Sequence, residues 1–436
     1  MKQIIKFLEY LRYLGFWFMD FLKGSKIKKH LKEIESILEH NDTLKSQTIR
    51  KKNLEGLLLH AVNTAPFYKT INSSNGLASF PVINKNVINK NSSHFQSSLF
   101  THKKIKTVTT SGSTGALLTI TQNPDKNNRN IADNLYFSKK AGFKIGNKLY
   151  YLRHWNAYFK KNKWALLFQN IYPVEAVGLS EKKIEDLIKN IKSDHSKKSW
   201  LGYASGFERI CQYLDAIASR PLDAKFKSII AISEHLSEQT RNRMAYYFQT
   251  PVMSRYSNME NGIIAQQPLN STSHYVINTA SYHLEILHLK NDNPLKLGQL
   301  GRIVITDLFN YATPLIRYDT GDLGVMDILN KVPVLRRIEG RSSDSIFNTN
   351  GDLVSSFIII DACNFKGINQ IQLIQCSKNG YTIKLNVTKT FSSQQELITN
   401  FKTYLGQDAE IDVVYVKEIP LLSSGKRQIT KNAFVG

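Results

Sequence analysis

The chain has 436 residues, of which 42% are hydrophobic and 11% aromatic, so it can bury more than one core and is not disordered. The net charge is +23, but its lysines are scattered and no nucleic-acid-binding motif accompanies them. A nucleic-acid partner is therefore not expected. The cysteines at 211, 363 and 376 form neither a disulfide framework nor a zinc pattern, which indicates a reducing, cytoplasmic setting.

Residues 1–22 mix apolar and aromatic residues with Lys6, Glu9 and Arg12. These charges interrupt the apolar run, so the segment is neither a secretory signal nor a membrane-spanning helix. We expect an N-terminal helix that docks on the body of the protein. A weak contact of residues 1–23 with the inner face of a membrane is the alternative, because a basic, aromatic helix can lie on a membrane interface.

The middle of the chain alternates between strand and helix patterns. Two helices are predicted within 26–63 and a longer one over 125–142. The alternation that follows predicts a parallel sheet covered by helices. The predicted strands are 148–152, 199–203, 228–232 and 252–256, and the predicted helices are 181–192, 206–219 and 237–248.

From residue 275 onward the pattern is rich in β-strands, and the last stretch mixes strands with a helix near 392–405. The predicted strands are 275–279, 283–289, 301–307, 332–338, 371–376, 381–387 and 411–416. We therefore predict an α/β protein. A large N-terminal domain of β-sheets covered by helices spans residues 1–343, with its N-terminal helices in 1–63, and a small mobile α+β domain spans 344–436.

The segment Val108–Gly115 holds two glycines and five hydroxyl residues in eight positions. Glycine allows the backbone to approach a ligand closely, and amide and hydroxyl groups can converge on phosphate oxygens. The segment is not a Walker A loop, because no Gly-Lys-Ser/Thr follows at the required spacing. A polar hairpin turn is the simpler interpretation of this segment when it is taken alone.

Two acidic segments follow later in the chain. Tyr256-Ser257-Asn258-Met259-Glu260 comes after a predicted strand, where its carboxylate could hold Mg²⁺ beside a phosphate chain. Tyr318-Asp319-Thr320-Gly321-Asp322 places two carboxylates around a Thr-Gly turn, and acidic side chains accept hydrogen bonds from ribose hydroxyls. Ordinary turns with solvated acids remain the alternative for both.

Two basic segments lie near the predicted domain boundary and the C-terminus. The run from Arg336 to Asp344 contains small polar residues where a hinge would lie. The run Ser423-Ser424-Gly425-Lys426 presents a lysine on a Ser/Gly loop. Such a lysine can neutralise charge on a developing oxyanion, although by itself it is a surface lysine.

In this order and spacing, these five segments resemble the adenylate-forming (acyl-activating) superfamily over most of the chain. His60-Ala61, Pro66-Phe67-Tyr68 and Phe80-Pro81-Val82 are most similar to the phenylacetate–coenzyme A ligase branch, and within it to the CapK-like proteins of surface-polysaccharide loci.

The resemblance implies roles for matching residues. Lys426, Glu260 and Arg341 would be catalytic, with Glu260 also holding Mg²⁺, and Asp344 would be the hinge. The nucleotide would be bound by Thr110, Ser111, Gly112, Ser113, Thr114, Gly115, Ser233, Glu234, Tyr256 and Asp322, of which Asp322 would bind the ribose. The acyl pocket would be lined by Gly202, Tyr203, His154 and Trp155.

The implied activity is ATP- and Mg²⁺-dependent activation of a small carboxylic acid as an acyl-adenylate. The acyl group would pass to coenzyme A or to an amine or hydroxyl acceptor, with surface-polysaccharide biosynthesis as the setting. The segment around Glu260 lacks the glycine and the threonine that the family usually has there. A catalytically idle nucleotide-binding scaffold at a membrane-associated assembly is therefore the alternative, and a nucleic-acid-binding protein ranks last.

Overall fold

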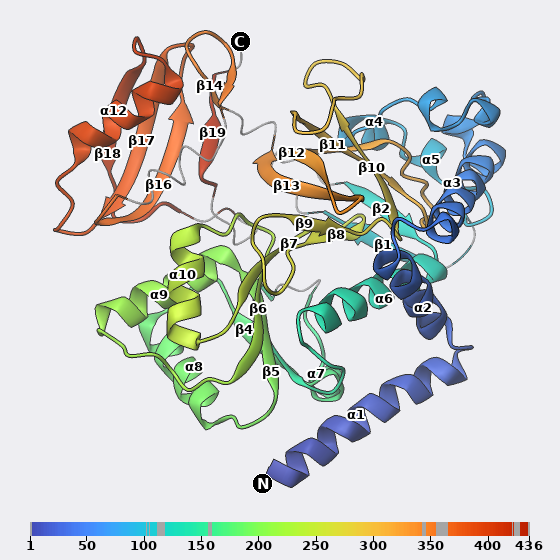
Figure 1. The fold of residues 1–436 in the computed structure, drawn as a ribbon, viewed down its shortest axis with the longest axis horizontal. Helices are drawn as coiled ribbons and strands as arrows, with labels where there is room; N and C mark the ends of the chain where they lie inside the picture. The colour runs from blue at the N-terminus through green and yellow to red at the C-terminus, as the bar shows by residue number, and fades with distance from the viewer. Residues whose placement is uncertain are drawn as a thin grey trace.

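The computed structural model describes residues 2–101, 103, 105–110, 118–155, 159–341, 346–354, 365–420, 422 and 428–434. Within them, eleven strands form one mixed sheet in the order β10-β11-β12-β13-β9-β8-β7-β6-β5-β3-β4. A separate four-stranded sheet has the order β18-β17-β16-β19. Figure 1 shows the smaller sheet and its helix beside the large body of the molecule.

The N-terminal third is largely helical. Helices α2 and α6 pack together, and their apolar residues form one small core with Ile263 and Ala280. The elements of this region are α1 (Lys2–Leu22), α2 (Lys26–Glu39), α3 (Leu44–Thr64), η1 (Pro66–Tyr68), η2 (Ser73–Asn75), η3 (Leu77–Ser79), α4 (Lys85–Lys90), α5 (Ser92–Phe95), β1 (Lys106–Thr109), β2 (Thr119–Gln122) and α6 (Pro124–Lys140).

The predicted parallel sheet is confirmed, because β4, β3, β5, β6 and β7 pair in parallel in that order. Helices α8 and α10 each begin after a serine, Ser180 and Ser237, whose hydroxyl accepts a backbone N–H of the first turn. Helices α8, α9 and α10 lie together over the parallel strands (Figure 1). The elements are β3 (Lys148–Arg153), α7 (Lys163–Gln169), β4 (Ile171–Glu175), α8 (Glu181–Ser193), β5 (Lys198–Tyr203), α9 (Ala204–Ala216), β6 (Phe226–Ile232), α10 (Glu238–Phe248) and β7 (Val252–Asn258).

The other half of the large sheet is antiparallel. Its strands are β8 (Gly262–Gln266), β9 (Tyr275–Ile277), β10 (Tyr282–Leu287), β11 (Leu300–Asp307), β12 (Tyr318–Leu329) and β13 (Val332–Arg341). The turn predicted between Asp319 and Asp322 is wrong, because these residues belong to β12. The register with β11 shifts between Arg302 and Val304, so an irregularity in the ladder accommodates Gly321, whose φ is +76°.

The last described segments form a small sheet with one helix. Its elements are β14 (Ile346–Phe347), β15 (Leu353–Val354), β16 (Ile368–Gln375), β17 (Gly380–Val387), α12 (Gln394–Leu405), β18 (Glu410–Tyr415) and β19 (Thr430–Asn432). Buried residues of these elements form a separate hydrophobic core that begins at Ile346. The fold class predicted from the sequence is therefore confirmed. The boundary predicted at 343/344 falls where the structure describes only the backbone of Arg341 and then resumes at Ile346.

Helix α6 carries charged residues into the interior. The Nζ of Lys126 lies 2.7 Å from Oδ2 of Asp307 at the end of β11, and neither side chain is exposed. Arg129, also fully buried, donates to the Ser281 hydroxyl and to the Ala280 carbonyl oxygen. Buried charges need such partners because desolvation of an unpaired ion is costly. These contacts fix α6 against the antiparallel half of the sheet.

None of the described helices is both long enough and apolar enough to cross a bilayer.

We predict that Lys126→Met lowers the free energy of unfolding by about 3–5 kcal/mol, because the buried Asp307 carboxylate would lose the cation that pairs with it and keep the Phe309 N–H as a donor. Urea denaturation followed by circular dichroism measures this loss. Lys140→Met is the matched control on the same helix. Its partner Glu39 is 2.9 Å away and both side chains are about half exposed, so the loss should be below about 1 kcal/mol. Equal losses would contradict the importance of the buried pair.

Candidate functional site

A cavity of about 350 Å³ lies between the large sheet and the small C-terminal domain. Arg153, Tyr203, Ile232 and the end of β7 line it from the carboxyl ends of four parallel strands. Ligands of open α/β sheets bind at such ends. Leu422 and residues 428–430 line the cavity from the C-terminal domain.

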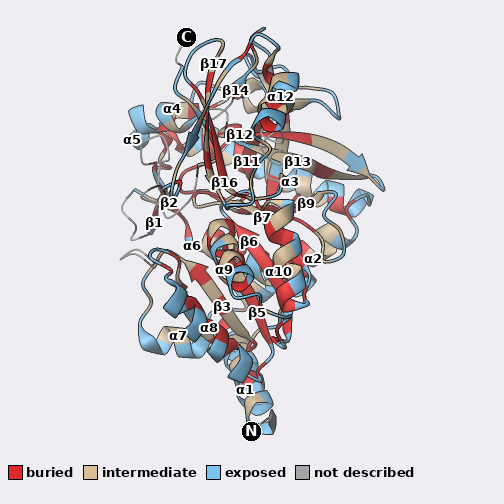
Figure 2. Ribbon diagram, turned by 90° about the vertical axis from the view of Figure 1, so that its left-hand side faces the viewer, coloured by how far each residue is buried: buried red, intermediate tan, exposed pale blue. Residues whose placement is uncertain are grey.

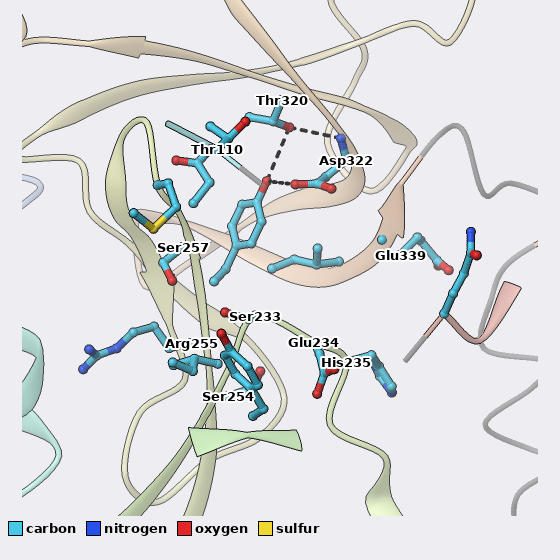
Figure 3. A pocket seen from close by; sticks show the side chains of 18 of the residues that line it. Thr110, Ser233, Glu234, His235, Ser254, Arg255, Ser257, Thr320, Asp322 and Glu339 are labelled. Carbon is cyan, nitrogen blue, oxygen red and sulfur yellow. Dashed lines mark hydrogen bonds between the residues drawn. The ribbon is translucent and has the colours of Figure 1, made fainter. Parts of the chain in front are cut away.

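Tyr256 and Asp322 both line this cavity, and their side chains are in contact. Figure 3 shows Asp322 beside Thr320 at the wall of the cavity. The Tyr256 hydroxyl donates to Oδ2 of Asp322 at 2.7 Å and lies 3.4 Å from the Thr320 hydroxyl. The Thr320 hydroxyl in turn accepts the Asp322 backbone N–H at 3.1 Å. Burial, reinforced by the Asp322 charge, raises the pKa of Tyr256 well above its usual value, so the phenol stays protonated and donates.

Glu260 follows β7, and only 3% of its side chain is exposed. Its Oε1 accepts from the Tyr318 hydroxyl at 2.8 Å and lies 3.9 Å from Nζ of Lys85. Gln122 of β2 donates to the Glu260 backbone carbonyl at 2.9 Å. Burial, reinforced by the Glu260 charge, raises the pKa of Tyr318 well above its usual value, so this phenol is also a donor.

Of the segment predicted to cradle phosphate, the structure describes Thr110. The β1–β2 ladder beside it pairs Thr109 with Thr119. Thr110 continues the ladder, since its N–H donates to the Leu118 carbonyl at 2.9 Å, and it lines the cavity. Ser111, Gly112, Ser113, Thr114 and Gly115 lie outside the described residues.

Ser233, Glu234 and His235 follow β6 and line the cavity (Figure 3). Ser233 has φ of +69°, a left-handed conformation that is uncommon for a residue with a Cβ. The Glu234 carboxylate accepts the N–H and the hydroxyl of Ser205, so it also caps the first turn of α9. Burial lowers the pKa of His235 to about 4, which leaves the imidazole neutral near pH 7.

The C-terminal part of the predicted site is described only in part. In the β12–β13 ladder, Asp322 is the direct partner of Arg341, of which the structure describes the backbone alone. Asp344 and Lys426 lie outside the described residues. Leu422 and Gln428, which flank the Lys426 segment in the sequence, both line the cavity.

The four predicted acyl-pocket residues separate into two groups. Tyr203 lines the cavity, whereas Gly202, His154 and Trp155 are not among the residues that line it. A Cβ at Gly202 would lie 2.8 Å from the Phe207 ring and 2.9 Å from Leu152, so this glycine allows helix α9 to pack closely on the sheet. His154 and Trp155 instead contact Glu175 at the end of β4. The assignment of these three residues to an acyl pocket stays a prediction.

Several lining residues were missed by sequence reasoning. Thr320 lines the cavity, and although it lies in the quoted segment it was given no role. Tyr318 of the same segment was also given no role; it does not line the cavity, but it donates to Glu260, which does. Period-2 spacing along a strand would have grouped Tyr318, Thr320 and Asp322 on one face, had the segment been read as β12. Tyr151, Arg153 and Lys85 carry no local sequence signal, because only the packing of distant elements brings them to the cavity.

The described lining suits a ligand with hydroxyl and phosphate groups. It offers the carboxylates of Glu260 and Asp322, several hydroxyl groups and the cations of Lys85 and Arg153. The described residues contain no cluster of three metal-binding side chains. A single carboxylate such as Glu260 nevertheless fits Mg²⁺, which takes most of its remaining ligands from water and phosphate.

Comparison with known proteins shows similarity in sequence and in structure. Residues 346–433 match the family model of the CapK C-terminal domain. The chain is 22% identical over 444 residues to Protein CapK of Staphylococcus aureus, covering 94% of each protein. ATP-bound MatB from Rhodopseudomonas palustris has a TM-score of 0.56 at 16% identity, covering 74% of this chain and 66% of that one.

The fold is also similar to that of 2-hydroxyisobutyryl-CoA ligase in the postadenylation state with 2-HIB-AMP. The TM-score is 0.71 at 15% identity, covering 89% of each chain. The same ligase in the thioesterification state gives 0.54 at 15% identity, covering 89% of this chain and 90% of that one. The fold expected from the motifs is confirmed: the chain has the fold of these ligases, and residues 346–433 match the model of the CapK C-terminal domain.

Proposed function

We propose that the protein activates a carboxylic acid with ATP, forming an acyl-adenylate and pyrophosphate. The observation that carries the proposal is the convergence of distant segments on one cavity. Thr110, Ser233, Tyr256, Glu260 and Asp322 come from separate parts of the chain and line the same space.

In the proposed reaction a substrate carboxylate oxygen attacks the α-phosphorus of ATP. A new P–O bond forms, the bond to the β-phosphate breaks, and pyrophosphate leaves with the electron pair. Such a step depends on positioning and charge neutralisation rather than on covalent work by the protein. The Asp322 carboxylate, held by Tyr256, would accept hydrogen bonds from the ribose. Glu260, held by Tyr318, would bind Mg²⁺, which neutralises phosphate charge when present.

Lys426 would approach the reacting phosphate from the C-terminal domain, and the position of Leu422 and Gln428 at the cavity supports this. Arg341 would assist from the strand position opposite Asp322. After adenylation the domain would rotate about Asp344 and admit an acceptor. Coenzyme A, or an amine or hydroxyl of a sugar, is the acceptor class. The setting of surface-polysaccharide biosynthesis is proposed from the resemblance of the sequence motifs alone.

Pyrophosphate release from Mg·ATP across aryl, fatty, amino and sugar acids, with hydroxylamine as a general acceptor, tests the reaction. We expect release with one class of acid and its loss in Lys426→Ala, whereas Lys417→Ala, an exposed lysine before the same loop, should keep it. Saturable ATP binding without release from any acid would favour the idle scaffold. Absence of ATP binding would contradict the proposal altogether.

Asp322 and Asp319 provide a matched pair on one strand, since Asp319 pairs with Arg302 at 2.7 Å and does not line the cavity. Asp322→Asn should raise the KM for ATP roughly 10- to 100-fold, because hydrogen bonds to a charged group are lost. Asp319→Asn should lower thermal stability and leave that KM unchanged. Steady-state kinetics with thermal melting separates the two effects, and equal KM values for both variants would refute the ribose role.

Glu260→Gln should raise the Mg²⁺ concentration needed for half-maximal pyrophosphate release by about tenfold or more, because a neutral amide is a weaker ligand for this hard cation. The control is Glu285→Gln, whose carboxylate pairs with Arg317 at 3.1 Å and does not line the cavity. Magnesium titration at fixed ATP measures both. An unchanged magnesium requirement in Glu260→Gln would exclude Glu260 as the ligand.

A further inference from the structure

Helix α1 directs its polar residues toward the protein. The Glu9 carboxylate accepts the Lys197 backbone N–H at 3.1 Å, and Arg12 donates to the Leu167 carbonyl at 3.1 Å. The Asp20 carboxylate accepts the first N–H groups of α2. A Cβ on Gly146 would lie 2.1 Å from the Glu9 carbonyl oxygen, so the backbone of α1 lies directly against the body. The helix is thus anchored through its hydrophilic side.

The opposite side of α1 is apolar and exposed. A surface helix of a globular protein normally has the reverse arrangement, with its apolar stripe turned inward. The outward apolar residues are Ile4, Phe7, Leu8, Tyr10, Leu11, Tyr13, Leu14, Phe18, Met19, Phe21 and Leu22. Figure 2 shows α1 projecting with mostly exposed residues at the end of the molecule opposite the C-terminal domain.

Helix α7 extends this apolar surface. The carbonyl oxygen of Leu167 in α7 accepts the hydrogen bond from Arg12 of α1. Both views place α7 beside α1 (Figures 1 and 2). Trp164 and Phe168 are 72% and 75% exposed, which is unusual for aromatic side chains in a short helix. We call the exposed apolar residues of α1 and α7 together the α1–α7 surface.

Within residues 3–32 and 159–170, the exposed charged side chains are all positive. The acidic residues of α1, Glu9 and Asp20, are buried against the protein. The described stretch 159–170 contains no acidic residue. The exposed charged residues of 3–32 and 159–170 are Lys6, Lys23, Lys26, Lys28, Lys29, Lys32, Lys160 and Lys163.

We propose that the α1–α7 surface binds the interface of a membrane that contains anionic lipids. Apolar and aromatic side chains would enter the headgroup boundary, and the surrounding lysines would contact lipid phosphates. Tyr and Trp side chains favour this boundary because they are apolar with a polar tip. A second copy of the chain is disfavoured as the occupant, since a symmetric contact would bring the two lysine-rich rims together. Binding in this way leaves the cavity and the C-terminal domain, at the other end of the molecule, facing away from the membrane.

Flotation of the full-length protein with phosphatidylcholine vesicles, with and without roughly one phosphatidylglycerol in four lipids, tests the proposal. We expect binding to the anionic vesicles that weakens with rising salt. The double variants Phe7→Ser/Phe18→Ser on α1 and Trp164→Ser/Phe168→Ser on α7 should each lower the partition coefficient about tenfold or more, because apolar insertion and charge attraction act together.

The control is Tyr246→Ser/Ile328→Ser, which removes two side chains of comparable exposure (53% and 50%) away from the surface. It should bind like the natural chain, and unchanged melting temperatures show that all variants are folded. The proposal is overturned by absence of flotation at roughly 0.15 M salt, or by equal flotation of the surface variants and the control. It is also overturned if light scattering finds a dimer that the α1 and α7 substitutions dissociate.

Discussion

The hydrogen bond between Tyr256 and Asp322 joins two strands that are far apart in the sheet. Three strands, β8, β9 and β13, separate β7 from β12 in the sheet order, yet the two side chains meet at 2.7 Å. The sheet must therefore curl so that its antiparallel half turns back over the carboxyl ends of its parallel half. This curvature creates the cavity, because it sets one wall opposite the other. The same contact also fixes the Asp322 carboxylate at the wall of the cavity.

Two tyrosine hydroxyls hold carboxylates at the cavity: Tyr256 holds Asp322, and Tyr318 holds Glu260. Tyr256 and Tyr318 remain protonated because burial and a neighbouring anion both raise their pKa. Each tyrosine hydroxyl therefore donates a hydrogen bond to a carboxylate: Tyr256 to Asp322, and Tyr318 to Glu260. The site thus holds negative side chains in fixed positions before any ligand arrives. Such preorganisation reduces the reorganisation that binding and reaction require.

The cavity and the α1–α7 surface lie in different parts of the molecule. The cavity lies beside the small C-terminal domain, and α1 and α7 carry the exposed apolar surface at the other end (Figure 2). Glu9, Arg12 and Asp20 hold helix α1 against the rest of the protein through hydrogen bonds. The exposed apolar residues of α1 are therefore carried by a helix that is packed on the fold. The proposed activation of an acid and the proposed attachment to a lipid surface would therefore not obstruct each other.

The sequence alone determined the fold class, the parallel sheet and the segments that line the cavity, because period and turn chemistry are local properties. The prediction of a turn at 318–322 was wrong. This segment is an irregular part of β12, and its pairing depends on the neighbouring strand β11, which is not adjacent to it in the sequence. The sequence also assigned Gly202, His154 and Trp155 to the acyl pocket; these residues do not line the cavity described here, and their role stays a prediction. Only the tertiary structure paired Tyr256 with Asp322 and turned the apolar side of α1 outward. Both depend on contacts between residues distant in sequence, which no local pattern encodes.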